Sequence, residues 1–209
     1  MTEFKEDINA AQPGDIIELK EEPANPKRIY LQAFRGNRDK VYMAMFDSKL
    51  EQSRNNEGPG PTEWECLVYT GHVGVSFEAL KPIYGFNPST GDDPVHVVME
   101  NLKARKAYPG KVTDDTPAFE LGSSHGLETI RIEYVCSEDA YNKIKAAFDK
   151  EKSNTELRYS FPNGNGDCNC ATWPANIGVP IPSADGNMRM YMKAMQDAPK
   201  RKYLGLMPE

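Results

Sequence analysis

The run of sequence that most constrains the fold extends from residue 66 to residue 77 and has the strongest strand character in the chain. In its second half the two valines and Phe77 alternate with His72, Gly74 and Ser76. Successive side chains of a strand point to opposite faces, so the valines would face a core and His72 would point away from it. An imidazole in that position, with a glycine beside it leaving room, is suited to act as a base in a cleft.

The rest of the chain divides into short segments. Residues 83–86 look like the hairpin partner of this strand, and residues 51–61 form a polar loop rich in glycine and proline. A helix could span 95–106, and Ser137 looks like the N-cap of another. Strands are predicted at 15–19, 28–34, 40–46 and 129–135, with a hairpin turn at 35–38. This order of elements predicts an α+β fold.

Composition limits the partners. Asp and Glu (31) outnumber Lys and Arg (25), and no basic cluster runs beyond Lys200–Lys202. Nucleic acid is therefore not expected as a partner. No apolar stretch approaches the roughly 20 residues that span a bilayer, and the first residues are too polar for a secretory signal. We expect a cytoplasmic protein, or one secreted by a route that uses no signal peptide, and its oligomeric state stays open.

The cysteines supply a candidate nucleophile. Four cysteines are too few for a disulfide scaffold of this length, so free thiols are expected. Cys170 follows a glycine-rich turn at 163–167 and precedes a predicted helix, whose first amides could receive an oxyanion. Pro174 lies only four residues later, so either the helix starts there with Cys170 in the loop ahead, or its first turn is irregular. A small buried hydrophobic role for Cys170 is about equally compatible with the sequence.

Other readings of these side chains are weaker. Cys168 and Cys170 could bind zinc together with histidines, but structural zinc sites space paired cysteines by two to four residues, and no second pair exists. A redox couple of the two thiols is similarly weak. His96 lies among valines and His125 in a loop, and both compete with His72 for the role of base. We expect no metal and no cofactor.

Two motifs together resemble a known family. Gly71-His72-Val73-Gly74-Val75, then a strand–helix unit, then Asn169-Cys170-Ala171-Thr172-Trp173 is similar to the circularly permuted branch of the NlpC/P60 papain-like superfamily, in which the histidine strand precedes the cysteine helix. The resemblance covers roughly residues 69–178. It implies an antiparallel sheet packed against helices in a single domain, 1–209, with extra N-terminal strands (1–50), a catalytic core (about 64–182) and a C-terminal tail (183–209).

The resemblance also implies the roles of individual residues. Cys170 aligns with the nucleophile and His72 with its base. A third polar residue usually follows on the next strand and orients the imidazole. Asn87 is the best candidate for it. The remaining candidates are Tyr84 and Glu78 for the same third role, and Asn169, Tyr84 and Trp173 for contact with substrate or oxyanion.

The expected function is cysteine-dependent hydrolysis or acyl transfer at an amide bond. The superfamily includes peptidases and amidases, so the substrate would be peptide-like or peptidoglycan, and the protein could be a bacterial effector. The alternative is a non-catalytic binding, immunity or adaptor protein. Its interaction face would consist of aromatic side chains, namely Trp64, Trp173, Tyr84 and Phe86.

Overall fold

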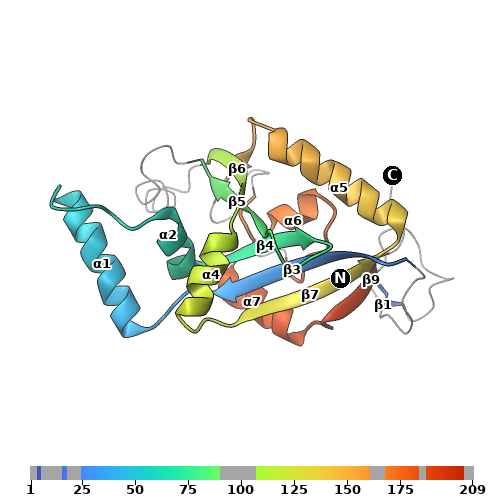
Figure 1. The fold of residues 1–209 in the computed structure, drawn as a ribbon, viewed down its shortest axis with the longest axis horizontal. Coiled ribbons are helices and arrows are strands. Elements are labelled where there is room, and N and C mark those ends of the chain that lie inside the picture. Colours follow the sequence, from blue (N-terminus) through green and yellow to red (C-terminus); the bar gives the residue numbers. More distant parts are fainter. Residues whose placement is uncertain are drawn as a thin grey trace.

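The structure, a computed structural model, describes residues 25–89, 107–160, 168–183 and 187–204, together with the strand pairs 4–5 and 16–17. Its centre is a mixed sheet with the strand order β1-β2-β9-β7-β3-β4-β5-β6-β8 (Figure 1). The strands are β1 (Phe4–Lys5), β2 (Ile16–Ile17), β3 (Lys27–Arg35), β4 (Gly71–Phe77), β5 (Tyr84–Pro88), β6 (Tyr108–Asp114), β7 (Thr129–Cys136), β8 (Arg158–Tyr159) and β9 (Arg201–Leu204).

Helices cover the sheet. They are α1 (Lys40–Arg54), α2 (Glu63–Thr70), α4 (Thr116–Ser124), α5 (Glu138–Ser153), α6 (Trp173–Asn176) and α7 (Met188–Asp197). One face of the sheet carries the main core, to which α5 contributes Ile144 and Phe148, α6 contributes Trp173, and α7 contributes Tyr191. The arrangement confirms the predicted α+β class. No helix within the described ranges is long and apolar enough to cross a membrane.

The opposite face is polar along most of its length and apolar at one end. In its middle, Gln32 on β3 donates a hydrogen bond from Nε2 to Ser76 Oγ on β4 at 2.9 Å. At the end where β4 begins, Phe34 packs edge-on against Phe119 of α4, with ring centroids 4.9 Å apart. Phe34 lies directly opposite His72 in the β3–β4 register. The end of the sheet that holds the candidate base is therefore enclosed by α2 and α4.

Several predicted elements are confirmed. The strands predicted at 28–34 and 129–135 are β3 and β7, and residues 83–86 fall at β5, which pairs antiparallel with β4. Ser137 caps α5 by accepting a hydrogen bond from the Ala140 amide at 3.2 Å. The N-terminal part of the chain is more than an elaboration, however, because β3 lies between β7 and β4 in the middle of the sheet. The predictions at 95–106, at 163–167 and for His96 lie outside the described residues.

The strand predicted at 40–46 is wrong, because these residues open helix α1. The Asp39 side chain accepts hydrogen bonds from the Val41 and Tyr42 amides, which caps the helix. Tyr42, Phe46 and Leu50 then repeat every four residues and are all buried. Residues 35–38 consequently connect a strand to a helix and form no hairpin.

The strand predicted for 66–77 is half helix. Thr62 and Glu65 form a capping box, in which each side chain accepts a hydrogen bond from the other residue's amide. The box starts α2, which ends at Gly71 with a φ of +88°. A glycine adopts this left-handed conformation without strain, so the chain can leave the helix and enter β4 one residue before His72.

Candidate active site

The His72 side chain extends from the start of β4 over Gly85 of β5. A Cβ atom added to Gly85 would lie 2.3 Å from His72 Nε2 and 2.0 Å from Asp115 Oδ2. The space for the imidazole therefore comes from a glycine on the neighbouring strand. Gly74, which the sequence suggested for this purpose, instead makes room for Ile83.

The His72 ring is held by a buried carboxylate. His72 Nε2 and Asp115 Oδ2 are 2.6 Å apart, and both side chains have no exposed surface. Asp115 lies immediately after β6 and is the N-cap residue of α4, yet its side chain makes no capping hydrogen bond. Asp114 accepts the hydrogen bond from the Thr116 amide instead, at 3.0 Å. The Asp115 carboxylate is thus free to face the imidazole.

Asn87 and Thr113 complete the environment of this carboxylate. Asn87 Nδ2 donates to Asp115 Oδ2 at 2.8 Å and to Thr113 Oγ1 at 2.7 Å, and Thr113 Oγ1 in turn donates to Asp115 Oδ1 at 2.6 Å. Both carboxylate oxygens therefore accept hydrogen bonds, which hold the carboxylate in place beside the imidazole. Asn87 was predicted to contact the imidazole itself. It contacts the residue that does so.

The second imidazole nitrogen, Nδ1, does not contact the Asp115 carboxylate. Nδ1 of His72 is buried and makes no hydrogen bond of standard geometry with any described residue. The Cys170 side chain is nevertheless close enough to act on the ring. Burial alone lowers the pKa of His72, but Cys170 and then Asp115 outweigh it and raise that pKa to about 10. The contact with Cys170 is looser than the contact with Asp115, as is common for catalytic pairs without substrate.

Cys170 lies in the turn just ahead of α6. Asn169 shapes this turn, because its Oδ1 accepts hydrogen bonds from the Ala171 and Thr172 amides at 2.9 and 3.3 Å. Its carbonyl oxygen accepts another from the Trp173 amide at 2.9 Å. Of the two possibilities that Pro174 left open, the structure has the short helix starting near the proline. The amides predicted to receive an oxyanion are thus occupied, whereas the Cys170 amide has no partner among the described residues.

Tyr159 also lies at the candidate site, beside Cys170, although no sequence feature indicated it. It forms a parallel β-bridge with Cys168, and the Ser160 amide donates to the Cys168 carbonyl oxygen at 2.9 Å. Burial first, and then the Cys170 and Cys168 side chains, raise the pKa of the Tyr159 phenol well above its ordinary value. The phenol consequently remains a hydrogen-bond donor beside the Cys170 thiol.

The members of the site differ in their exposure. His72 and Asp115 have no exposed surface, whereas Cys170 retains 8 %. A reagent or substrate can therefore reach the thiol more readily than the base. A hollow on the described surface is lined by other residues, chiefly from α7, the end of β3 and the start of β7, so it is separate from the thiol.

Three further candidates lie elsewhere. Tyr84 is paired with Val75 on the core face and packs against Phe148, with ring centroids 4.9 Å apart. Glu78 follows the far end of β4 and forms an ion pair with Lys27. Trp173 is fully buried in the main core, so the prediction that it contacts substrate is not supported.

The structure also bears on His125 and on the hypothesis of a zinc site. His125 is an exposed residue at the end of α4, and its ring packs against Tyr42 with centroids 4.8 Å apart. Among the described residues, no group of three or more His, Cys, Asp and Glu side chains is arranged to hold a metal ion. All four cysteines are free thiols.

Replacing Gly85 with alanine is expected to displace the His72–Asp115 pair, because the added methyl group would overlap both side chains. A shift of about 1 Å in a catalytic group costs on the order of 100-fold in rate, so turnover should fall by about that factor. Gly122→Ala is the matched control, since its new Cβ would make only ordinary contacts. Equal rates for the two variants would contradict the placement of the pair over Gly85.

No family model, curated protein or solved structure matches the chain.

Proposed function

We propose that the protein is a cysteine-dependent acyl-transfer enzyme that cleaves an amide bond, with Cys170 as nucleophile, His72 as base and Asp115 as the residue that orients the base. The observation that carries the proposal is the buried contact of His72 Nε2 with Asp115 at 2.6 Å, combined with the effect of Cys170 on the same imidazole. A nucleophile, its base and a third group that orients the base constitute the arrangement on which thiol hydrolases depend.

In the proposed reaction, His72 has taken the thiol proton on Nδ1 before substrate binds, and Cys170 attacks the carbonyl carbon as a thiolate. Asp115 fixes the tautomer, because a carboxylate that accepts a hydrogen from Nε2 leaves Nδ1 unprotonated in the neutral ring. It also stabilises the imidazolium that forms. His72 then donates the proton to the leaving amine, and water hydrolyses the thioester with His72 again acting as base.

The oxyanion of the tetrahedral intermediate needs donors close to Cys170. We assign this role to the Cys170 amide and the Tyr159 hydroxyl. The amide has no other partner among the described residues, and the hydroxyl remains protonated beside the thiol. The amides of the following residues are bound to Asn169. Asn169 therefore acts as a positioning residue in this scheme.

The order of these residues along the chain, base first and nucleophile last, is that of the permuted NlpC/P60 branch. Peptide-like compounds, including peptidoglycan, are accordingly the first substrates to test. The experiment is to incubate the purified protein with peptidoglycan and with a mixed peptide library, and to quantify newly released amino groups. Amide cleavage predicts their release. Release that also occurs after the nucleophile is removed would refute the assignment.

The alternative, a non-catalytic protein with an aromatic interaction face, receives less support. Two of the four aromatic residues proposed for that face, Trp173 and Phe86, are fully buried, and their rings stack on each other in the core with centroids 6.1 Å apart. They cannot contribute to a binding surface in this fold.

The raised pKa of His72 predicts how the site depends on pH. The imidazole should remain protonated up to about pH 10. Because its folded-state pKa lies above the unfolded value of about 6.5, the stability that it contributes is fully present below pH 6.5. That stability is lost as the pH rises through 10. Asp115→Asn removes one of the charges that raise this pKa, so His72 should then titrate at lower pH.

Nuclear magnetic resonance of the three imidazoles, labelled with ¹⁵N, measures this directly. In the wild-type protein one histidine should not titrate between pH 5 and 8, and in Asp115→Asn its midpoint should move downward. His125→Ala identifies one of the other signals. A His72 that titrates near pH 6.5 in the wild-type protein would contradict the proposed contacts.

A further inference from the structure

One half of β7 has an unpaired edge. β9 pairs with β7 only from Glu133 onward, whereas residues 129–132 pair with β3 alone. The Glu133 amide donates to the Lys200 carbonyl oxygen at 2.7 Å, on the side away from β3. Backbone groups alternate in direction along a strand, so those of Thr129 and Arg131 point the same way. Among the described residues they have no hydrogen-bond partner.

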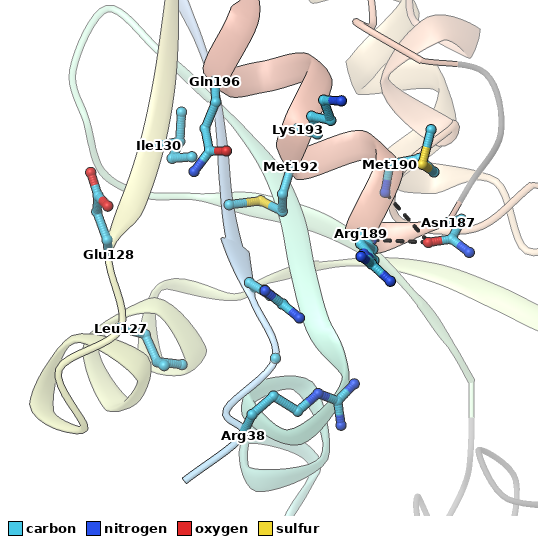
Figure 2. Close-up of a pocket in the computed structure, with 12 residues that line it drawn as sticks. Arg38, Leu127, Glu128, Ile130, Asn187, Arg189, Met190, Met192, Lys193 and Gln196 are labelled. Carbon is cyan, nitrogen blue, oxygen red and sulfur yellow. Dashed lines mark hydrogen bonds between the residues drawn. The ribbon is translucent and has the colours of Figure 1, made fainter.

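Two hollows follow this edge. The larger has a volume of about 820 Å³ and lies between α7, the start of β7 and the loop after β3 (Figure 2). The smaller, of about 350 Å³, is lined by residues 128–131 of the open edge together with Gln196 and Lys200. Both include Glu128, Ile130 and Gln196, so they form one continuous groove, which we call the β7 groove.

The β7 groove is basic, although the whole chain has a net charge of −6. Among the residues that the structure describes, Glu128 is the only acidic one that lines it. In Figure 2, Arg38 lies on the loop after β3 and extends across α2, where its guanidinium carbon is 5.9 Å from the centroid of the Tyr69 ring. The basic residues that line the groove are Arg35, Arg38, Arg131, Arg189, Lys193 and Lys200. Each is exposed, and within the described part of the chain none of them forms an ion pair.

The apolar lining of the groove favours an acidic peptide over a single-stranded nucleic acid as the occupant. It consists of aliphatic and thioether side chains, namely Leu127, Ile130, Met190 and Met192. No aromatic side chain of the described ranges lines either hollow, whereas proteins that bind single-stranded nucleic acid stack the bases on aromatic rings. Unpaired strand edges, by contrast, bind extended peptides through main-chain hydrogen bonds. Arginine guanidinium groups bind carboxylates through paired hydrogen bonds.

We propose that the β7 groove binds an extended acidic peptide segment, which adds to the sheet as a strand beside residues 129–132. Main-chain hydrogen bonds to Thr129 and Arg131 would fix its register, and its carboxylates would contact Arg38 and Arg189. This inference does not depend on the chemistry of Cys170. The β7 groove would bind the peptide even if the thiol were inert. Failure to bind the peptide would leave the proposed amide cleavage unaffected.

The binding test uses the full-length protein and fluorescein-labelled ten-residue peptides, measured by fluorescence anisotropy. A peptide of alternating Glu and Val should bind, and the corresponding Gln–Val peptide should bind at least about 10-fold more weakly. Backbone N-methylation of one alternate set of residues should abolish binding, whereas methylation of the other set should have little effect, because only one set faces the β7 edge. Equal effects of the two methylated peptides would refute strand addition.

Protein variants locate the site. Arg38→Glu combined with Arg189→Glu should weaken binding of the Glu–Val peptide at least about 10-fold, and Thr129→Pro should weaken it by removing an outward-facing amide. Lys143→Glu combined with Lys145→Glu, on α5, is the matched charge control and should bind as the wild type does. Since Thr129→Pro could unfold the protein, the methylated peptides provide the same information without changing the chain.

Three results would overturn the proposal. The first is binding that is unchanged in the Arg38→Glu, Arg189→Glu variant. The second is tighter binding of a single-stranded oligonucleotide than of the Glu–Val peptide. The third is a dimer, detected by sedimentation velocity, that dissociates in the arginine variant, because the occupant of the groove would then be a second copy of the chain.

Discussion

Cys170→Ala is expected to abolish amide cleavage, with a loss of at least about 10⁴-fold in turnover. The Cys170 sulfur is the proposed attacking atom, and neither His72 nor Asp115 can replace it, because both are fully buried. The measurement is the release of amino groups from the substrate that the peptidoglycan and peptide screen identifies. The folded state should persist, since a cysteine that retains 8 % exposure leaves only a small void when it is shortened.

Cys168→Ala is the matched control for this experiment. Cys168 has the same exposure as Cys170, and its sulfur accepts a hydrogen bond from Asn176 Nδ2 at 3.5 Å. The substitution changes a thiol in the same turn without removing the proposed nucleophile. We expect Cys168→Ala to retain most of the activity. If Cys168→Ala lost activity and Cys170→Ala kept it, the nucleophile would be Cys168, and the assignment to Cys170 would be wrong.

His72→Ala is expected to lower turnover by about 10³- to 10⁴-fold, because it removes the group that takes the thiol proton and protonates the leaving amine. It should also destabilise the fold by about 1–3 kcal/mol, since the buried Asp115 carboxylate loses a partner at 2.6 Å. Steady-state kinetics measure the first effect and thermal unfolding measures the second. Turnover must be determined at a temperature at which the variant is folded.

His125→Ala is the matched histidine control. Its ring is exposed and contacts Tyr42, at the opposite end of α4 from Asp115. This variant should retain wild-type turnover. A variant of His72 that is folded and fully active would show that the imidazole is a structural group, and the acyl-transfer scheme would then lack its base.

The β3, β4, β5 and β7 strands could be predicted from local alternation, because half-buried strands show it directly in the sequence. The misassigned segments were α1 and α2, where aromatic and branched residues indicated strands. Their capping residues favour a helix over a strand in both segments. Asp39 and the Thr62–Glu65 box each satisfy amides at a helix start, and the buried residues of α1 then repeat every four positions.

Only part of the candidate site could be predicted from the sequence. The association of His72 with Cys170 rested on two motifs, each of which is continuous in the sequence. Asp115 has no such signal, because an aspartate ahead of Thr116 and Pro117 is typical of a helix start. Its role follows from the register of β5 and β6, which places Gly85 opposite Thr113 and brings the residues after β6 to the imidazole. Register is a tertiary property, and it also determines the position of Tyr159.

The most direct test of the account is the rate at which iodoacetamide alkylates Cys170 at pH 6, followed by peptide mass spectrometry in the wild-type protein and in His72→Ala. The thiolate is the reactive form, and an adjacent imidazolium favours it. Cys170 should therefore react much faster than the buried Cys136, whose pKa is raised to about 12 by burial. His72→Ala should slow the reaction of Cys170 by at least about 10-fold. A slow rate that is the same with and without the imidazole would contradict the central claim.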